Sequence, residues 1–148
     1  MTRSVFAFVA VAAAVGIGFA ASLASAQDTR TAAVTVRSSA HGRILFDGRG
    51  RALYAFTRDA KRQSRCSGDC ARAWPPYVVR ARPRAAAGVK QSLIGTTRRA
   101  DRKLQATYAG RPLYFYVGDR RAGEVRCQNV DEFGGTWLVV RASGRLVR

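Results

Sequence analysis

Short runs of apolar and aromatic residues, separated by turns rich in glycine and charged side chains, recur along the chain after an apolar N-terminal stretch. Runs of this length that carry β-branched or aromatic residues predict strands, and glycine-containing turns between them predict hairpins. The predicted strands are residues 43–47, 51–57, 77–80, 93–98, 104–108, 113–117, 133–141 and 145–147. Residues 33–37 also alternate, so the segment 27–40 is either a first strand or an N-terminal arm.

One short helical turn is expected near residues 70–74. Asp69 can cap its start, and the prolines that follow Trp74 must end it, because a residue before proline is displaced from the helical region. The segment 80–88 has no apolar period and is expected to connect the two halves of the chain.

A stretch of ten residues occurs twice, at 50–59 and at 110–119. Equivalent positions are 60 apart, and they are Tyr54 and Tyr114, Phe56 and Tyr116, and Asp59 and Asp119. Each copy follows a predicted hairpin and precedes a polar loop with a cysteine, a tryptophan and a Val-Val strand. This correspondence predicts an internal duplication.

The duplication predicts a mainly β fold of small antiparallel sheets, built from two tandem repeats with pseudo-twofold symmetry as packed sheets or a small barrel-like arrangement. A single domain of residues 41–148 contains the repeats at 41–80 and 92–148. Side chains alternate across a strand, so the aromatic face of residues 54–56 is expected to be the buried one. The second copy, 113–117, is apolar throughout and is expected to be covered on both faces.

Residues 1–26 have the pattern of a secretory signal peptide. Arg3 precedes an uncharged run that ends in the small residues Ala24-Ser25-Ala26, a cleavage pattern. The alternative is a transmembrane anchor, since the apolar run approaches the length of a bilayer span. Its alanine-rich composition favours the signal, so we expect no transmembrane segment after its removal. The first cysteine is Cys66, and a lipid anchor at the mature N-terminus is not expected.

The chain carries 26 Lys and Arg against 9 Asp and Glu, for a formal net charge of +17. A surface this basic favours polyanionic partners. The basic residues are mostly arginines spread along the chain, without a nucleic-acid fold signature. A solvated basic surface with loose electrostatic adhesion is the favoured interpretation, and a specific polyanion-binding role is the alternative. The candidate partner is an anionic cell-envelope polymer or surface, and a specific nucleic acid is not expected.

The three cysteines are Cys66, Cys70 and Cys127. An exported protein meets an oxidising compartment, so at least one disulfide is expected. A Cys66–Cys70 bond that leaves Cys127 free is favoured, and the alternative joins Cys127 to one of the other two. Cys66 and Cys70 could also form a thiol redox or copper pair. The chain offers one histidine, His41, and one methionine, so we predict neither a metal site nor a cofactor.

The repeated motif residues Tyr54, Phe56 and Asp59, with Tyr114, Tyr116 and Asp119, allow two interpretations. They could form a ligand platform, or the aromatic rings could fill a core while each aspartate closes the turn after its strand. Duplication with unchanged spacing favours the structural role. No phosphate loop, zinc pattern or nucleophile elbow occurs. No catalytic residue is predicted.

These motifs are similar to a bacterial family described as a secreted repeat of unknown function, or as predicted lipoproteins with a Tyr-x-[Phe/Trp/Tyr]-x-x-Asp motif. The similarity covers residues 41–144, including segment 66–71, the Trp74-Pro75-Pro76 sequence and the Gly-Gly-Thr-Trp of 134–137. The resemblance implies export and an envelope or extracellular location, without an established activity. We therefore expect a non-catalytic exported protein, with a thiol redox or copper-handling function of Cys66 and Cys70 as the alternative.

Overall fold

The described part of the chain, residues 32–148 of a computed structural model, forms short strands and one short helix. The predicted signal peptide at residues 1–26 lies outside the described residues. The strands are β1 (Ala33–Ser39), β2 (Gly42–Asp47), β3 (Tyr54–Phe56), β4 (Arg84–Ala85), β5 (Ile94–Arg98), β6 (Leu104–Tyr108), β7 (Arg111–Pro112), β8 (Val130–Glu132) and β9 (Gly135–Val139). Helix α1 is Asp69–Ala73, and a 3-10 turn covers Gln91–Leu93.

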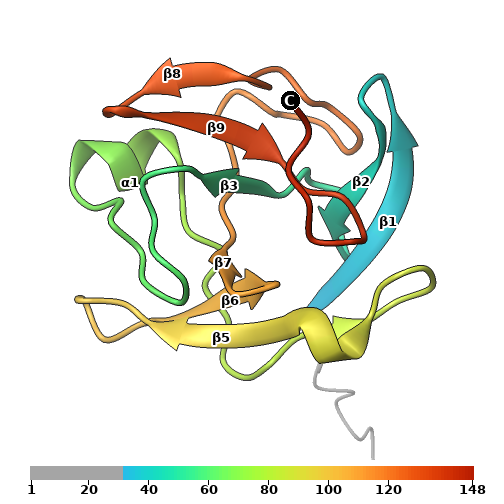
Figure 1. Ribbon diagram of the computed structural model, residues 1–148, viewed down its shortest axis with the longest axis horizontal. Coiled ribbons are helices and arrows are strands. Elements are labelled where there is room, and N and C mark those ends of the chain that lie inside the picture. Colours follow the sequence, from blue (N-terminus) through green and yellow to red (C-terminus); the bar gives the residue numbers. More distant parts are fainter. Residues whose placement is uncertain (1–31) are drawn as a thin grey trace, which may run out of the picture.

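The strands form three small sheets, in the orders β2-β1-β4, β3-β9-β8 and β5-β6-β7. Figure 1 shows the second sheet at the top, the third at the bottom, β1 and β2 on the right and α1 opposite them. The predicted mainly β fold of two repeats is confirmed. Further backbone hydrogen bonds join sheet strands to segments outside the sheets, such as Leu45 N to Val140 O at 2.8 Å and Ala106 N to Tyr77 O at 2.9 Å.

One strand pair differs from the antiparallel expectation. The described part of segment 27–40 forms strand β1, which pairs antiparallel with β2 along its length and parallel with the two residues of β4. The segment 80–88 is thus more than a connection. Arg84 N donates to Ala32 O and Ala86 N donates to Val34 O, both at 2.8 Å. A pairing this short depends on backbone groups alone, so no side-chain period in the sequence indicates it.

Two hairpins close through residues with positive φ. Ala109 and Gly110 have φ values of 48° and 77° between β6 and β7, and Phe133 and Gly134 have 53° and 75° between β8 and β9. Two successive residues with positive φ make the type I′ turn, whose twist matches that of the strands. The Ala109–Gly110 turn lies between the predicted strands 104–108 and 113–117, whereas strand β8 was not predicted.

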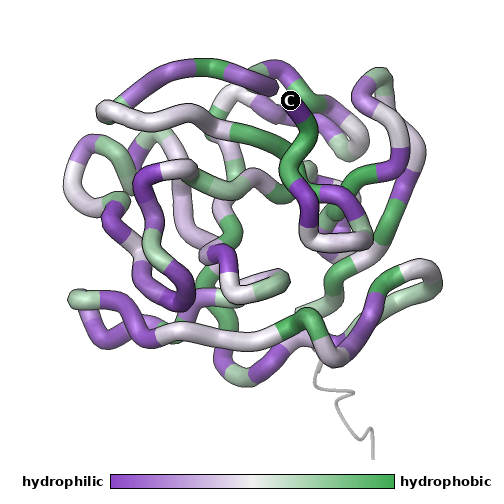
Figure 2. The backbone as a smooth tube through the Cα atoms, in the orientation of Figure 1, coloured by the Kyte–Doolittle hydropathy of each residue, from purple (hydrophilic) through white to green (hydrophobic). Residues whose placement is uncertain are grey.

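The buried residues form two clusters, one on each side of the repeated motif. Tyr54 and Phe56 belong to the first cluster, and Leu53 and Ala55 belong to the second. The expectation that only the aromatic face of this strand is buried was therefore wrong. The strand runs through the middle of a small protein, and its other face is apolar enough to be covered too. Figure 2 shows the second half of β9 as hydrophobic, followed by a more hydrophilic loop before the C-terminus.

Several predicted elements are shorter than expected. Segments 77–80 and 145–147 form one isolated bridge each, at Val78 and Leu146, and segment 113–117 forms two, both at Tyr114. The expected helical turn is α1, but Asp69 does not cap it through its side chain. The N-cap residue is Gly68, with a φ of 56°, and the Asp69 carboxylate pairs with the exposed Arg72 guanidinium instead.

Candidate functional site

The two copies of the repeated motif meet at their tyrosines. Tyr54 N donates to Tyr114 O, and Tyr114 N donates to Tyr54 O, each at 2.9 Å. This antiparallel pair of backbone hydrogen bonds relates two positions that are equivalent in the repeats. It therefore marks the pseudo-twofold relation between the two halves.

The tyrosine of each motif binds the aspartate of the other motif. The Tyr54 hydroxyl donates to Asp119 Oδ2, and the Tyr114 hydroxyl donates to Asp59 Oδ2, both at 2.7 Å. The second oxygen of each carboxylate closes a loop: Asp59 Oδ1 accepts from Arg65 N at 2.7 Å, and Asp119 Oδ1 accepts from Arg126 N at 2.9 Å. The motif thus braces each repeat against the other, since neither Tyr–Asp bond lies within one copy.

Burial controls the ionisation of this brace. Desolvation raises the pKa of both Asp59 and Asp119 above the ordinary value, and the hydrogen bonds from tyrosine and backbone partly offset the rise. Burial also raises the pKa of Tyr54 and Tyr114 well above the usual range. Both tyrosines therefore remain protonated donors at physiological pH.

The remaining motif aromatics and the two tryptophans form one stack. Phe56 lies on Trp137 at a ring distance of 4.2 Å, Trp137 lies on Trp74 at 4.1 Å with the planes 2° apart, and Tyr116 lies 4.7 Å from Trp74. Both tryptophans are fully buried. Aromatic pairs add roughly 0.5–1.5 kcal/mol to the effect of burial. The stack is thus a core element that joins equivalent residues of the two repeats.

Two carboxylates outside the motif, Asp47 and Glu124, also stabilise loops. Asp47 is buried, accepts the backbone N–H groups of Arg49 and Arg51, and pairs with the Arg51 guanidinium at 2.9 Å. Glu124 accepts from the backbone of Arg120 and from the side chain of Arg126. These hydrogen bonds lower the pKa of Glu124 to about 2. Both carboxylates therefore hold turns.

Cys66 and Cys70 form the favoured disulfide, with their Cα atoms 5.3 Å apart, and Cys127 is a buried free thiol. Cys127 occupies the position in the second repeat that Cys66 has in the first, 61 residues earlier. Burial raises the pKa of the Cys127 thiol, with Tyr116 beside it. A protonated buried thiol is a poor nucleophile and a poor metal ligand.

Within residues 32–148, His, Cys, Asp and Glu side chains form no group of three that could hold a metal ion. His41 lies in the turn between β1 and β2, where its backbone N–H donates to Ser39 Oγ.

Arg99 is a buried arginine that no sequence pattern predicts. The side chain of Arg99 is 6% exposed and donates to Ser64 Oγ, Gln105 Oε1 and Cys66 O, each at 2.7 Å. It ties the disulfide loop of the first repeat to strand β6 of the second. In the sequence Arg99 stands in a polar turn among other basic residues, and nothing there distinguishes a buried guanidinium from an exposed one.

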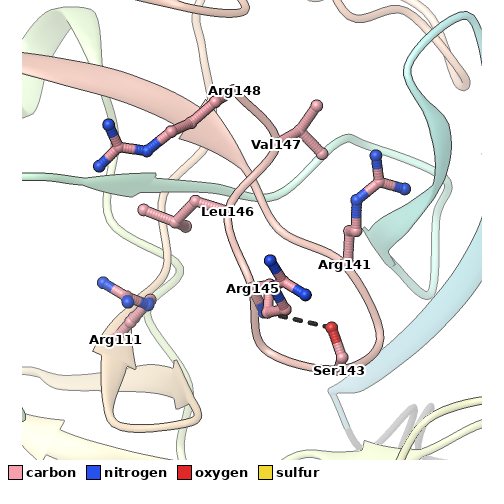
Figure 3. A pocket seen from close by; sticks show the side chains of 7 residues that line it. All are labelled: Arg111, Arg141, Ser143, Arg145, Leu146, Val147 and Arg148. Atoms are coloured by element: carbon pink, nitrogen blue, oxygen red, sulfur yellow. Dashed lines mark hydrogen bonds between the residues drawn. The ribbon is translucent and has the colours of Figure 1, made fainter.

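A surface pocket lined by four arginines lies between β7 and the C-terminal segment after β9 (Figure 3). Its volume is about 620 Å³, within the range of roughly 300–1,000 Å³ typical of ligand sites. The lining residues are Arg111, Arg141, Ser143, Arg145, Leu146, Val147 and Arg148. No local pattern indicates this pocket, because its arginines are spread over almost forty positions without a period.

A family described as a secreted repeat of unknown function has a model that matches the chain twice, at residues 35–77 and 95–141. The comparisons with curated proteins and with solved structures gave no match. Each matched segment contains one copy of the Tyr-Asp motif, one half of the cross-repeat brace and one tryptophan of the stack. The matches together cover more than half of the chain. The chain therefore belongs to this family of secreted repeat proteins.

Proposed function

We propose that this exported protein is a non-catalytic binding protein that adheres to an anionic polymer of the cell envelope or its surroundings. One observation carries the proposal: every arginine in residues 32–148 is exposed, apart from Arg99. With a formal net charge of +17, the surface presents far more guanidinium groups than its carboxylates can neutralise. Such a field attracts polyanions from a distance.

The use of the reactive side chains supports a role without catalysis. The motif aspartates bind tyrosines and loop amides, Asp47 and Glu124 hold turns, and the first two cysteines are joined. A general acid or base needs a position from which it can reach a substrate proton. Here the carboxylates already satisfy groups of the protein itself.

The alternative, a thiol redox or copper-handling function, has less support. Cys66 and Cys70 are bonded to each other and are 1% and 7% exposed. A redox pair requires an accessible thiolate or an accessible disulfide. No helix among residues 32–148 has the length and apolar character to cross a membrane.

Retention on intact cell envelopes over a salt series tests the proposed function. The protein is expected to sediment with envelopes at low salt and to be released by about 0.5 M salt, because the Debye length falls from about 10 Å at 0.1 M to about 3 Å at 1 M. Sedimentation without envelopes is the control. Absence of retention at low salt would refute the proposal. Retention that persists unchanged at 0.5 M salt would replace electrostatic adhesion with another mode of binding.

A further inference from the structure

Hydrogen bonds of the backbone hold the walls of the pocket lined by four arginines in place. The C-terminal segment turns back on itself, with Arg141 N donating to Arg145 O at 2.9 Å and Val147 N donating to Val139 O at 3.0 Å. The Tyr108 hydroxyl donates to Ala142 O at 2.7 Å, and Gln128 Nε2 donates to Val147 O at 2.8 Å. Opposite this segment, Arg111 lies in strand β7, which pairs with β6. The pocket walls are thus parts of the folded domain, while its guanidinium groups are exposed.

The pocket concentrates positive charge. None of its lining residues has an acidic side chain. Within residues 32–148, the ion pairs of the structure involve other basic residues, namely Arg51, Arg72, Arg99, Lys103 and Arg126. Four guanidinium groups therefore line the pocket without an acidic side chain among them. Arginine stays protonated in proteins, so an anionic ligand would reduce the repulsion among these groups.

The placement of the guanidinium groups indicates an extended ligand. In Figure 3, Arg111 and Arg148 lie on one side of the segment 145–147, and Arg141 lies on the other. A single small anion on one side would leave the guanidinium group on the other side without an anionic partner. A chain that carries anionic groups at intervals can contact both sides.

We propose that this pocket binds the phosphate groups of an extended anionic polymer. This inference rests on the proposed function and assigns it a site and a chemical class. A guanidinium group forms two parallel hydrogen bonds with a phosphate or a carboxylate. A carboxylate accepts hydrogen bonds close to the plane of its two oxygens, so guanidinium groups must approach it near that plane. The free oxygens of a tetrahedral phosphate point in several directions, so guanidinium groups that approach from different walls can share it.

Affinity for inorganic polyphosphate of defined length, measured by calorimetry over a salt series, tests the assignment. The pocket variant is Arg141→Gln/Arg145→Gln. The matched control is Arg120→Gln/Arg121→Gln, which removes the same charge from two exposed arginines outside the pocket. The pocket variant is expected to bind polyphosphate about tenfold more weakly than the unaltered protein at low salt. Its plot of log affinity against log salt concentration should be less steep by about 1.5, because each phosphate contact in nucleic acids contributes about 0.7–0.9 to that slope. The control is expected to change less than about threefold.

The outcomes separate the site from the function. Equal losses in the two variants, or no loss in the pocket variant, would overturn the pocket while leaving surface adhesion in place. Polygalacturonate of matched charge is the comparison ligand that carries carboxylates. If the protein binds it as tightly as polyphosphate, the phosphate assignment is overturned. Failure of the unaltered protein to bind any polyanion would overturn the proposed function together with this inference. Unchanged melting temperatures of both variants confirm that they fold.

Discussion

Replacement of Trp74 or Trp137 by alanine is expected to destabilise the protein by about 3–5 kcal/mol, the usual cost of deleting a fully buried large aromatic side chain. Both indoles are 0% exposed and stack on each other at 4.1 Å. Each also meets the motif tyrosine of its own repeat edge-on, Tyr54 at 5.2 Å from Trp74 and Tyr114 at 5.1 Å from Trp137. Urea unfolding followed by circular dichroism measures the loss as a lower midpoint with an unchanged slope.

The two tryptophans differ in one respect that sharpens this prediction. Trp74 Nε1 donates to Glu132 Oε2 at 2.8 Å, whereas Trp137 Nε1 is buried and has no hydrogen-bond partner within residues 32–148. Trp74→Phe should therefore cost about 1 kcal/mol more than Trp137→Phe, since only the first leaves an acceptor unpaired. Phe133→Ala is the control, because this aromatic ring is 40% exposed. A loss as large for Phe133→Ala as for the tryptophans would contradict the assignment of the core.

Removal of either motif hydroxyl, in Tyr54→Phe or Tyr114→Phe, is expected to cost about 1–3 kcal/mol at pH 7. Each hydroxyl is the side-chain donor to a partly buried carboxylate of the other repeat, at 2.7 Å. Hydrogen bonds to charged groups contribute about 1.5–3 kcal/mol, and a buried acceptor left without its donor keeps its desolvation cost. Thermal unfolding and urea unfolding at fixed pH measure the effect.

The cost of these hydroxyl variants should depend on pH with a definite sign. Burial raises the pKa of Asp59 and Asp119 in the folded protein. A raised pKa favours folding fully below the unfolded value of about 3.9, and this advantage is lost as the pH rises through the folded value. Loss of the tyrosine donor raises the folded pKa of its partner further. The variants should therefore lose more stability relative to wild type at pH 7 than at pH 3.

Tyr108→Phe is the control for this pH dependence. The Tyr108 hydroxyl donates to the neutral Ala142 carbonyl at 2.7 Å. Its loss should destabilise by a similar amount at pH 3 and pH 7. A cost of Tyr54→Phe that is equally independent of pH would show that its partner is not an ionised carboxylate.

Local sequence patterns correctly predict the strands and turns whose structure depends on neighbouring residues. The hairpin of β5 and β6 matches the expected segments closely, because both strands are rich in β-branched or apolar residues and a polar turn separates them. The duplication also indicated which residues are equivalent. It did not indicate that Tyr54 and Tyr114 would each reach across to the other aspartate, because spacing within one repeat says nothing of contacts between repeats.

The features that the sequence could not indicate depend on tertiary placement. The burial of Arg99 follows from the approach of the disulfide loop to β6. Its acceptors in that loop, Ser64 and Cys66, are 35 and 33 residues away along the chain. The four arginines of the pocket come together because β7 lies beside the C-terminal segment. Both arrangements join residues that carry no distinguishing local signal.

The central claim is that the repeated Tyr-Asp motif holds the two repeats together while the ligand binds elsewhere. Its most direct test measures melting temperature and polyphosphate affinity for the Asp59→Asn and Asp119→Asn variants. Asp69→Asn serves as the control, since the Asp69 side chain is 75% exposed. The motif variants are predicted to melt several degrees lower than the control, since each kcal/mol of lost stability lowers the melting temperature by roughly 4–8 °C in a domain near this size. Their affinity for polyphosphate is predicted to be at least as high as that of wild type. Unchanged melting temperatures together with abolished binding would contradict the claim.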